Sequence, residues 1–425
     1  MPQQSALEYI RSGQTPFFRL PCADPHGLTG VDAALIGVTF DAGTTYQPGA
    51  RLAPYHLRRV SALVQPVHPV HGVDVFEQVR TVDAGNVAFP PFEPGAMREA
   101  VQRDVAAIAN AGAVPFVIGG DHSIALPVLR ALAQKHGPLS VLHVDAHLDT
   151  STPEAWGSVH HHGTPFRHAL AEGLISPGRL VQVGLRATWG KTGDPDFARM
   201  HDARQVAMEE IERHGMAAVA REVRERLDGR PVYVSFDVDA IDPAFAPGTG
   251  TPVPGGLTSR EAFQLLRALR GVKLVGMDLV EVCPALDHAD LTCHLGVASS
   301  LRRACAARLR RPQNSRDRTG RPYGLPSNSS ADSVRAVAAI LIVGSLSGAN
   351  PDECSEGSGV PDLSDASYFA GSAAPTRSCT DGTPAALPNS PKSSATISGL
   401  ASSTFCAPIC LAIAAESRFV TAGSL

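Results

Sequence analysis

The chain has 425 residues and a formal net charge of −4, so it can bury a large core but lacks the basic excess that nucleic acid or an anionic membrane would attract. Residues 1–13 contain no apolar stretch typical of a secretory signal, and no apolar run approaches the length of a membrane span. The eight Cys residues show no paired spacing, which favours a reduced, cytoplasmic protein. We therefore expect neither a nucleic-acid nor a membrane partner.

Apolar and amphipathic segments alternate along the first 300 residues. We expect strands at residues 34–40, 114–118, 139–144, 180–185, 232–236 and 273–282, and helices at residues 97–111, 125–135, 216–227 and 259–269. Thr258 or Ser259 is the expected cap of the last helix. Repeated strand–helix units predict an α/β fold with a mostly parallel sheet covered by helices on both faces.

The sequence changes character after about Leu295. All 16 His residues lie at or before His294, whereas five of the eight Cys residues lie at Cys305 or later, in a stretch rich in Ser, Pro, Gly and Ala. We expect residues 1–27 to form an N-terminal arm, residues 28–295 to form the folded domain, and residues 296–425 to be a disordered tail.

Three short segments carry six side chains that commonly bind metal ions, and each segment follows an apolar strand. The six residues are His122, Asp145, His147, Asp149, Asp237 and Asp239. Ligands in open α/β sheets bind at the carboxyl ends of the strands, where these side chains emerge. Four Asp and two His are too many carboxylates for one closed site unless cations neutralise them.

The spacing predicts two metal ions. Asp145 and Asp237 each begin a pair of ligands two residues apart, which point to the same side of an extended chain, and they are the expected bridging carboxylates. His122 with Asp149 would complete one ion, and His147 with Asp239 the other. Carboxylate and imidazole ligands suit Mn²⁺ better than thiolate-binding metals. Two neighbouring ions can acidify a shared water, which favours hydrolysis.

These motifs resemble the ureohydrolase family, which contains arginase, agmatinase and related guanidino-acid hydrolases. The resemblance covers about residues 28–295 and includes further matching segments at residues 40–51, 162–167, 248–252 and 281–284. It implies a three-layer α/β/α sandwich, the same six ligands for two Mn²⁺ ions per subunit, and urea as a product. It also implies a homo-oligomer, usually a trimer or a hexamer.

The resemblance implies three further roles. His162 matches a histidine that shuttles a proton to the leaving amine, and Glu281 matches a carboxylate that receives the substrate guanidinium, a planar cation with forked donors. Asp149 would orient the attacking hydroxide in addition to binding metal. The products would be urea and an alkylamine.

The sequence also allows the candidate guanidino substrates to be ranked. The segment from Gly184 to Ala187 lacks the acid with which arginase-like enzymes read an α-amino group, so arginine is disfavoured. Agmatine, which gives putrescine in polyamine biosynthesis, is the first choice, and 4-guanidinobutyrate or 3-guanidinopropionate is the alternative. An acid at the pocket mouth would favour agmatine, and Arg or Lys would favour a guanidino acid.

Several neighbouring polar residues have simpler interpretations. We expect His160 and His161 to be exposed loop residues, and His143 to be packed behind the ligands. Asp121 is expected either to cap the following helix or to orient a neighbour. Asp242, followed by Pro, is typical of a turn.

Two other classes of protein stay open. Codons that are possible for residues 296–306 spell a family-like closing helix when shifted by one base, so the tail can be interpreted as out-of-frame translation. The chain would then be a non-catalytic or misfolded product. An arginase-like zinc deacetylase would need only one Asp-His-Asp set. Metal stoichiometry separates these possibilities: two ions per chain for a ureohydrolase, one for a deacetylase, and weak or no binding for a damaged product.

Overall fold

The computed structural model describes residues 15–68, 73–191 and 194–298, and the statements below concern those residues. Eight parallel strands form one sheet in the order β4-β1-β5-β10-β9-β6-β7-β8. The strands are β1 (Ala33–Gly37), β4 (Thr81–Asn86), β5 (Val114–Ile118), β6 (Leu139–Val144), β7 (Ile175–Leu185), β8 (Arg204–Ala207), β9 (Pro231–Asp237) and β10 (Lys273–Val280). A separate antiparallel pair joins β2 (Val67–His68) to β3 (Val73–Asp74).

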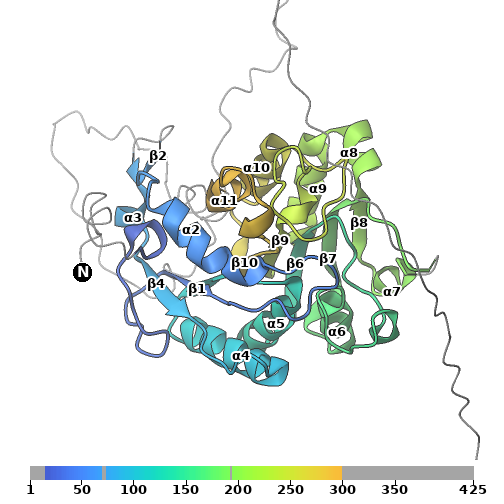
Figure 1. Ribbon diagram of the computed structural model, residues 1–425. Helices are drawn as coiled ribbons and strands as arrows, with labels where there is room; N and C mark the ends of the chain where they lie inside the picture. The colour runs from blue at the N-terminus through green and yellow to red at the C-terminus, as the bar shows by residue number, and fades with distance from the viewer. Residues whose placement is uncertain (1–14, 69–72, 192–193, 299–425) are drawn as a thin grey trace, which may run out of the picture. The chain divides into compact units, whose positions relative to one another are not determined.

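Helices cover both faces of the sheet, which makes the predicted three-layer α/β/α sandwich (Figure 1). One layer contains α4 (Pro94–Asn110), α5 (Ala125–His136), α6 (Pro165–Ala171) and α7 (Asp196–Arg199). The other contains α2 (Ala53–Ser61), α3 (Val75–Gln78), α8 (Met208–His214), α9 (Met216–Leu227), α10 (Ser259–Ala268) and α11 (Leu291–Val297). The predicted fold class is therefore confirmed.

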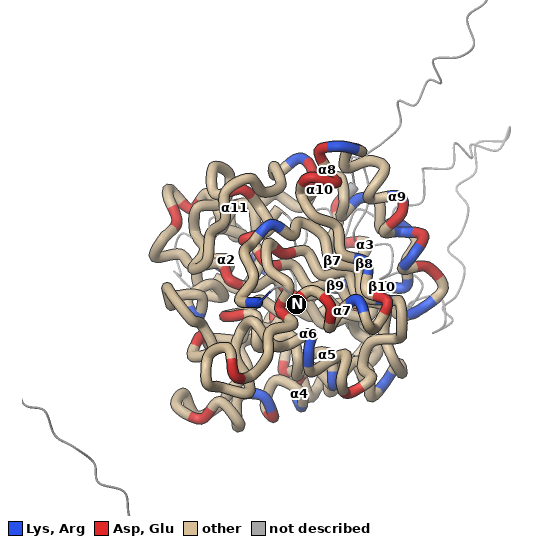
Figure 2. Tube along the Cα trace, turned by 90° about the vertical axis from the view of Figure 1, so that its right-hand side faces the viewer, with Lys and Arg blue, Asp and Glu red and all other residues tan. Residues whose placement is uncertain are grey.

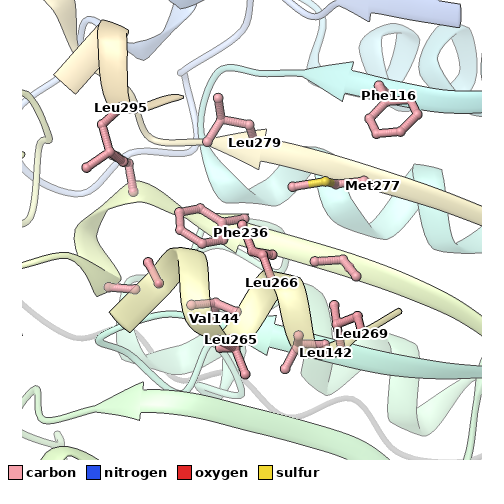
Figure 3. Close-up of a cluster of buried hydrophobic side chains, with 14 of the residues drawn as sticks. Phe116, Leu142, Val144, Phe236, Leu265, Leu266, Leu269, Met277, Leu279 and Leu295 are labelled. Carbon is pink, nitrogen blue, oxygen red and sulfur yellow. The ribbon is translucent and has the colours of Figure 1, made fainter. Parts of the chain in front are cut away.

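Each face of the sheet contributes to its own hydrophobic core. On β5, Phe116 and Ile118 belong to one core and Val117 to the other, because successive side chains of a strand point to opposite faces. Figure 3 shows strand residues such as Phe236 and Met277 near Leu266 of α10. A parallel sheet that is buried on both faces requires continuous apolar strands, which explains why these strands were recognisable in the sequence.

The predicted elements agree best in the centre of the sheet. Strands β5 and β6 and helix α9 have the predicted bounds. Thr258 is the cap of α10, since its side chain accepts from the Glu261 N–H and the Glu261 side chain accepts in return. Strand β10 ends at Val280 instead of residue 282, because Glu281 turns into a left-handed conformation with φ of 60°. The edge strands β4 and β8 were not predicted.

The ends of the predicted domain differ from a simple arm and tail. Phe17 and Phe18, within the predicted N-terminal arm, are each only 1% exposed and pack into the core beside α2. Helix α11 runs to Val297, two residues past the predicted boundary. The predicted disorder and frameshift concern mainly residues 299–425, which lie outside the described residues.

Charged residues of both signs are distributed along the described chain. Figure 2 shows Lys and Arg interspersed with Asp and Glu on the outer helices and loops. Among the described residues, no helix combines the length and the apolar character that crossing a membrane requires.

Candidate metal centre

The strand order places the candidate ligands side by side. Strands β5, β10, β9 and β6 are consecutive in the sheet, and a candidate residue stands at the carboxyl end of each. His122 follows β5, Glu281 follows β10, Asp237 ends β9 and Asp145 follows β6. These segments, which are far apart in sequence, therefore meet at the carboxyl ends of the central strands, as the motifs predicted.

One group of side chains surrounds His122. Its Nδ1 atom lies 3.0 Å from Asp145 Oδ2, 3.0 Å from Asp149 Oδ2 and 3.1 Å from Asp237 Oδ2. The imidazole is 1% exposed, and Nδ1 has no hydrogen-bond partner. A buried nitrogen that faces three carboxylates without a hydrogen bond is in the position of a metal ligand.

A second group is built around His147. Its Nδ1 atom lies 2.9 Å from Asp239 Oδ2 and 3.3 Å from Asp145 Oδ1. Asp145 therefore presents one oxygen to each histidine, since its other oxygen lies beside His122. The two groups, which share this carboxylate, form a cluster suited to a binuclear metal site.

The electrostatics of the cluster show an excess of buried negative charge. Burial, followed by repulsion from Asp239 and Asp145, raises the pKa of Asp237 well above its usual value. Burial and Asp145 likewise raise the pKa of Asp239. Burial opposes protonation of His147, but Asp239 and Asp145 outweigh it and raise its pKa to about 12. Bound cations would remove the repulsion that these shifts express.

A polar chain behind His122 fixes the orientation of its ring. His122 Nε2 lies 2.8 Å from Ser235 Oγ, and that hydroxyl donates to Asp278 Oδ1 over 2.9 Å. The Tyr233 hydroxyl also donates to Asp278, whose pKa is raised by burial. Such outer contacts hold a ligand histidine in one tautomer and one orientation. Sequence analysis missed Ser235, Asp278 and Tyr233, of which only Ser235 contacts the His122 ring directly.

His143 supports Asp145 as the sequence predicted. It is fully buried, and its Nε2 atom lies 2.7 Å from Asp145 Oδ2. Gln182 Nε2 lies 3.0 Å from His143 Nδ1 and also donates to the Leu148 carbonyl. With Nδ1 accepting from Gln182, Nε2 carries the proton and donates to Asp145. His143 therefore holds the Asp145 carboxylate, which the two groups share, from behind.

His162 lies between two partners at the side of the cluster. Its Nδ1 atom is 3.0 Å from Glu281 Oε1, and its Nε2 atom is 2.8 Å from Thr45 Oγ1. Burial lowers the pKa of His162, but the contact with Glu281 outweighs burial and raises the pKa to about 9. Sequence analysis did not single out Thr45, which lies within the matching segment at residues 40–51.

Two of the candidate residues have a backbone conformation that is rare outside glycine. Asp149 has φ of 50° and Glu281 has φ of 60°. Such left-handed residues are costly, and they cluster at functional sites where the surrounding structure holds them. Asp149 lies in the loop after β6 and Glu281 directly follows β10, and each presents its carboxylate to a histidine of the site.

A pocket of about 590 Å³ opens above the cluster. His147, Asp149, Asp237 and Asp239 are among the residues that line it, and so is His162. Glu281 is only 2% exposed and is not one of the lining residues in the described part of the chain. The pocket is of the size that holds a small molecule, and four of the six candidate ligands line it.

Three simpler interpretations can now be compared with the structure. The prediction that His161 is exposed is wrong: it is 4% exposed, because the turn that follows folds back so that the Gly163 N–H donates to its ring. Asp121 both caps the short helix after β5, through the Ser123 N–H, and accepts from the Gly43 N–H. Asp242 accepts from the Ala244 N–H within a turn, as predicted, and also from the N–H groups of Gly255 and Gly256 farther along the chain.

Comparisons with known proteins agree with this class of site. The arginase family model matches residues 31–304. Proclavaminate amidinohydrolase from Streptomyces clavuligerus is 45% identical over 66% of this chain and 90% of its own length. Its solved structure matches 67% of this chain and 93% of that chain, with 44% identity and a TM-score of 0.64. The human mitochondrial guanidino acid hydrolase is 40% identical over 69% of this chain and 83% of its own length. The mitochondrial agmatinase of Gallus gallus is 41% identical over 63% and 78%.

A cluster of buried carboxylates and histidines at the carboxyl edge of a parallel sheet, in a fold shared with amidinohydrolases, defines a metal-dependent hydrolase. The chain belongs to the arginase family. It is an amidinohydrolase, which cleaves a C–N bond of a guanidino compound.

Proposed function

We propose that this chain hydrolyses agmatine to urea and putrescine at two Mn²⁺ ions. The observation that carries the proposal is the position of Asp145, whose two oxygens lie beside His122 and His147 respectively. A carboxylate in that position can bridge two cations. A single-metal deacetylase would leave one of the two histidine groups without a function.

We assign the six predicted ligands as the motifs suggested. His122 and Asp149 would hold one ion, His147 and Asp239 the other, and Asp145 and Asp237 would bridge them. Bound divalent cations would supply an acidified water as nucleophile and would stabilise negative charge as it develops. The donor set consists of carboxylate oxygens and imidazole nitrogens and contains no thiolate, which fits Mn²⁺.

The remaining chemistry is proton transfer and orientation by protein groups. With a pKa of about 9, His162 is protonated at neutral pH and can act as the acid for the leaving amine. Glu281 Oε1 holds the ring nitrogen Nδ1, and Thr45 Oγ1 holds Nε2. We propose that the proton is donated from Nε2, the nitrogen on the Thr45 side. Asp149 reaches the pocket from its left-handed position and would orient the attacking water.

Glu281 has a different environment from the one its predicted role requires. Its Oε1 atom accepts from the backbone N–H of His122 and lies 3.0 Å from Nδ1 of the His162 ring. We propose that its first role is to hold and charge His162. Its contact with the substrate guanidinium stays a prediction, since Glu281 is not among the described residues that line the pocket.

The pocket mouth supports agmatine over arginine. Ala187 lines the pocket where an acid would be needed to read an α-amino group. Glu154 and Asp194 also line the pocket, and Lys191 is the one Lys or Arg among its described lining residues, so these two acids outnumber the base. An excess of acids favours a substrate whose distal group is a cation.

A guanidino acid is the second candidate. Lys191 at the mouth could receive a carboxylate, and one of the similar proteins is named a guanidino acid hydrolase. A homo-oligomeric state, trimer or hexamer, is a further proposal that follows from the family resemblance. A cytoplasmic location is proposed from the unpaired spacing of the Cys residues.

The test is urea release by the purified full-length protein loaded with Mn²⁺. Agmatine, 4-guanidinobutyrate, 3-guanidinopropionate and arginine are offered in parallel, with His147→Ala as the inactive control. We expect the highest kcat/KM for agmatine. A higher value for either guanidino acid would select the second candidate. No urea from any substrate would contradict the proposed function and favour a damaged, non-catalytic product.

A further inference from the structure

Both tryptophans of the chain lie in the same pocket. The 425 residues contain two Trp, at positions 156 and 189, and both line the pocket above the candidate metal ligands. Trp156 is 65% exposed and Trp189 is 53% exposed. Large aromatic rings are usually buried, so two half-exposed Trp side chains at one opening indicate a surface that binds something.

The two rings come from different segments of the chain. Trp156 follows the short helix Pro153–Ala155, in the loop after β6, and Trp189 lies in the loop after β7. Strands β6 and β7 are neighbours in the sheet, so both loops leave the same edge. Asp149 and His147, at the start of the first loop, carry the proposed metal contacts. A substrate with its guanidinium at the metals would therefore extend the rest of its chain toward these loops.

Two carboxylates, those of Glu154 and Asp194, and one ammonium group, that of Lys191, lie beside the two rings among the described lining residues, and this excess of acids favours a cation. Glu154 precedes Trp156 by two residues, and hydrogen bonds from its own backbone and from Thr152 lower the pKa of this exposed carboxyl, so it is ionised at neutral pH. Asp194 lines the same pocket and accepts the Lys191 N–H over 2.8 Å. The face of a Trp ring attracts cations, and its flat apolar surface also covers an alkyl chain.

We propose that Trp156 and Trp189 determine substrate specificity by binding the chain of the substrate beyond its guanidinium, with preference for an alkyl chain that ends in a cation. The inference rests on the proposed function, because it takes the metal cluster as the place where the guanidinium reacts. It concerns the other end of the substrate. The two residues do not touch the reacting atoms, so their loss should weaken binding and leave the chemical step intact.

The first test compares substrates with and without a tail. Agmatine and methylguanidine share the reacting group, but only agmatine reaches the aromatic rings. In Trp156→Ala and Trp189→Ala we expect KM for agmatine to rise about tenfold, with kcat changed less than twofold, on the order of a cation–aromatic contact. The kcat/KM for methylguanidine should stay the same. Phe in place of each Trp should restore most of the loss, because it keeps an aromatic face.

A matched control separates a specific role from general damage. Phe92 is 92% exposed and is not one of the residues that line the pocket, so Phe92→Ala should leave both substrates unaffected. Equal losses for agmatine and methylguanidine in the Trp variants would overturn the proposal, since they would show a structural or catalytic defect. Unchanged agmatine kinetics in both variants would overturn it as well.

Intrinsic fluorescence gives a readout that does not depend on turnover. Because the chain has no other Trp, Trp156→Phe and Trp189→Phe each leave a single fluorophore in the pocket. We expect putrescine, a diamine without a guanidinium, to change the emission of the metal-loaded protein in both variants, and propionate at equal concentration to change it less. If no substrate releases urea but putrescine still changes the emission, the proposed function fails and the binding surface stands. No change with putrescine in either variant would overturn the inference.

Discussion

Removal of the Ser235 hydroxyl tests whether the polar chain behind His122 supports the metal site. Ser235 is fully buried, and its Oγ atom lies 2.8 Å from His122 Nε2 and 2.9 Å from Asp278 Oδ1. In Ser235→Ala the His122 N–H would have no acceptor. Asp278 would lose one donor and keep the Tyr233 hydroxyl and the Phe236 N–H.

The expected magnitude follows from these two losses. A buried polar group that is left unpaired costs about 1–3 kcal/mol, and one lost hydrogen bond costs about 1 kcal/mol. We therefore expect Ser235→Ala to lower the free energy of unfolding by about 2–4 kcal/mol, a large part of a typical total of about 5–15 kcal/mol. Because the ring of His122 loses its orientation, metal affinity should fall about 10–100-fold.

Ser140→Ala is the matched control. Ser140 is also fully buried on a central strand, but its Oγ has no hydrogen-bond partner, so its removal should be neutral or slightly stabilising. Unfolding by urea and titration with Mn²⁺ measure both quantities for the two variants. Equal stability and equal metal affinity of Ser235→Ala and Ser140→Ala would refute the argument.

Two other predictions concern proton transfer and packing. The pKa of His162 is raised from 6.5 to about 9, so its acid form is present below about pH 9. We therefore expect kcat to fall as pH rises through that value. If the pH–rate profile of His162→Asn still showed this fall, another group would be its cause. The same shift stabilises the fold fully below pH 6.5, and this contribution is lost as pH rises through about 9. A Cβ on Gly120 would lie 1.6 Å from the Phe40 carbonyl oxygen, so Gly120→Ala should give little soluble protein. Gly95→Ala in α4, where a Cβ meets nothing within 4 Å, should raise stability by up to about 1 kcal/mol, and thermal melting of both variants checks the contrast.

The central strands and the six candidate ligands could be predicted because both follow from local patterns. Strands that are buried on both faces must be continuously apolar, and a carboxylate or imidazole at the end of such a run is conspicuous. The edge strand β4, with Asp83 and Gly85 in its sequence, has no such pattern. Its pairing with β1 depends on tertiary structure, which a short stretch of sequence does not reveal.

The supporting contacts could not be predicted because they depend on strand register. Ser235 meets Asp278 only because β9 pairs with β10 in a register that places the two residues opposite each other. Thr45 meets His162 across 117 positions of sequence. The two tryptophans gave no signal for the same reason, since only the adjacent loops after β6 and β7 bring them to one pocket.

The most direct test of the account is the number of metal ions per chain. The central claim is that Asp145 bridges two cations held by the His122 and His147 groups. Elemental analysis of the full-length protein, loaded with Mn²⁺ and dialysed, should give two ions per chain for the wild type. His147→Ala should keep one ion, and Asp145→Asn should retain fewer than the wild type. One ion per wild-type chain, unchanged in His147→Ala, would contradict the two-metal site.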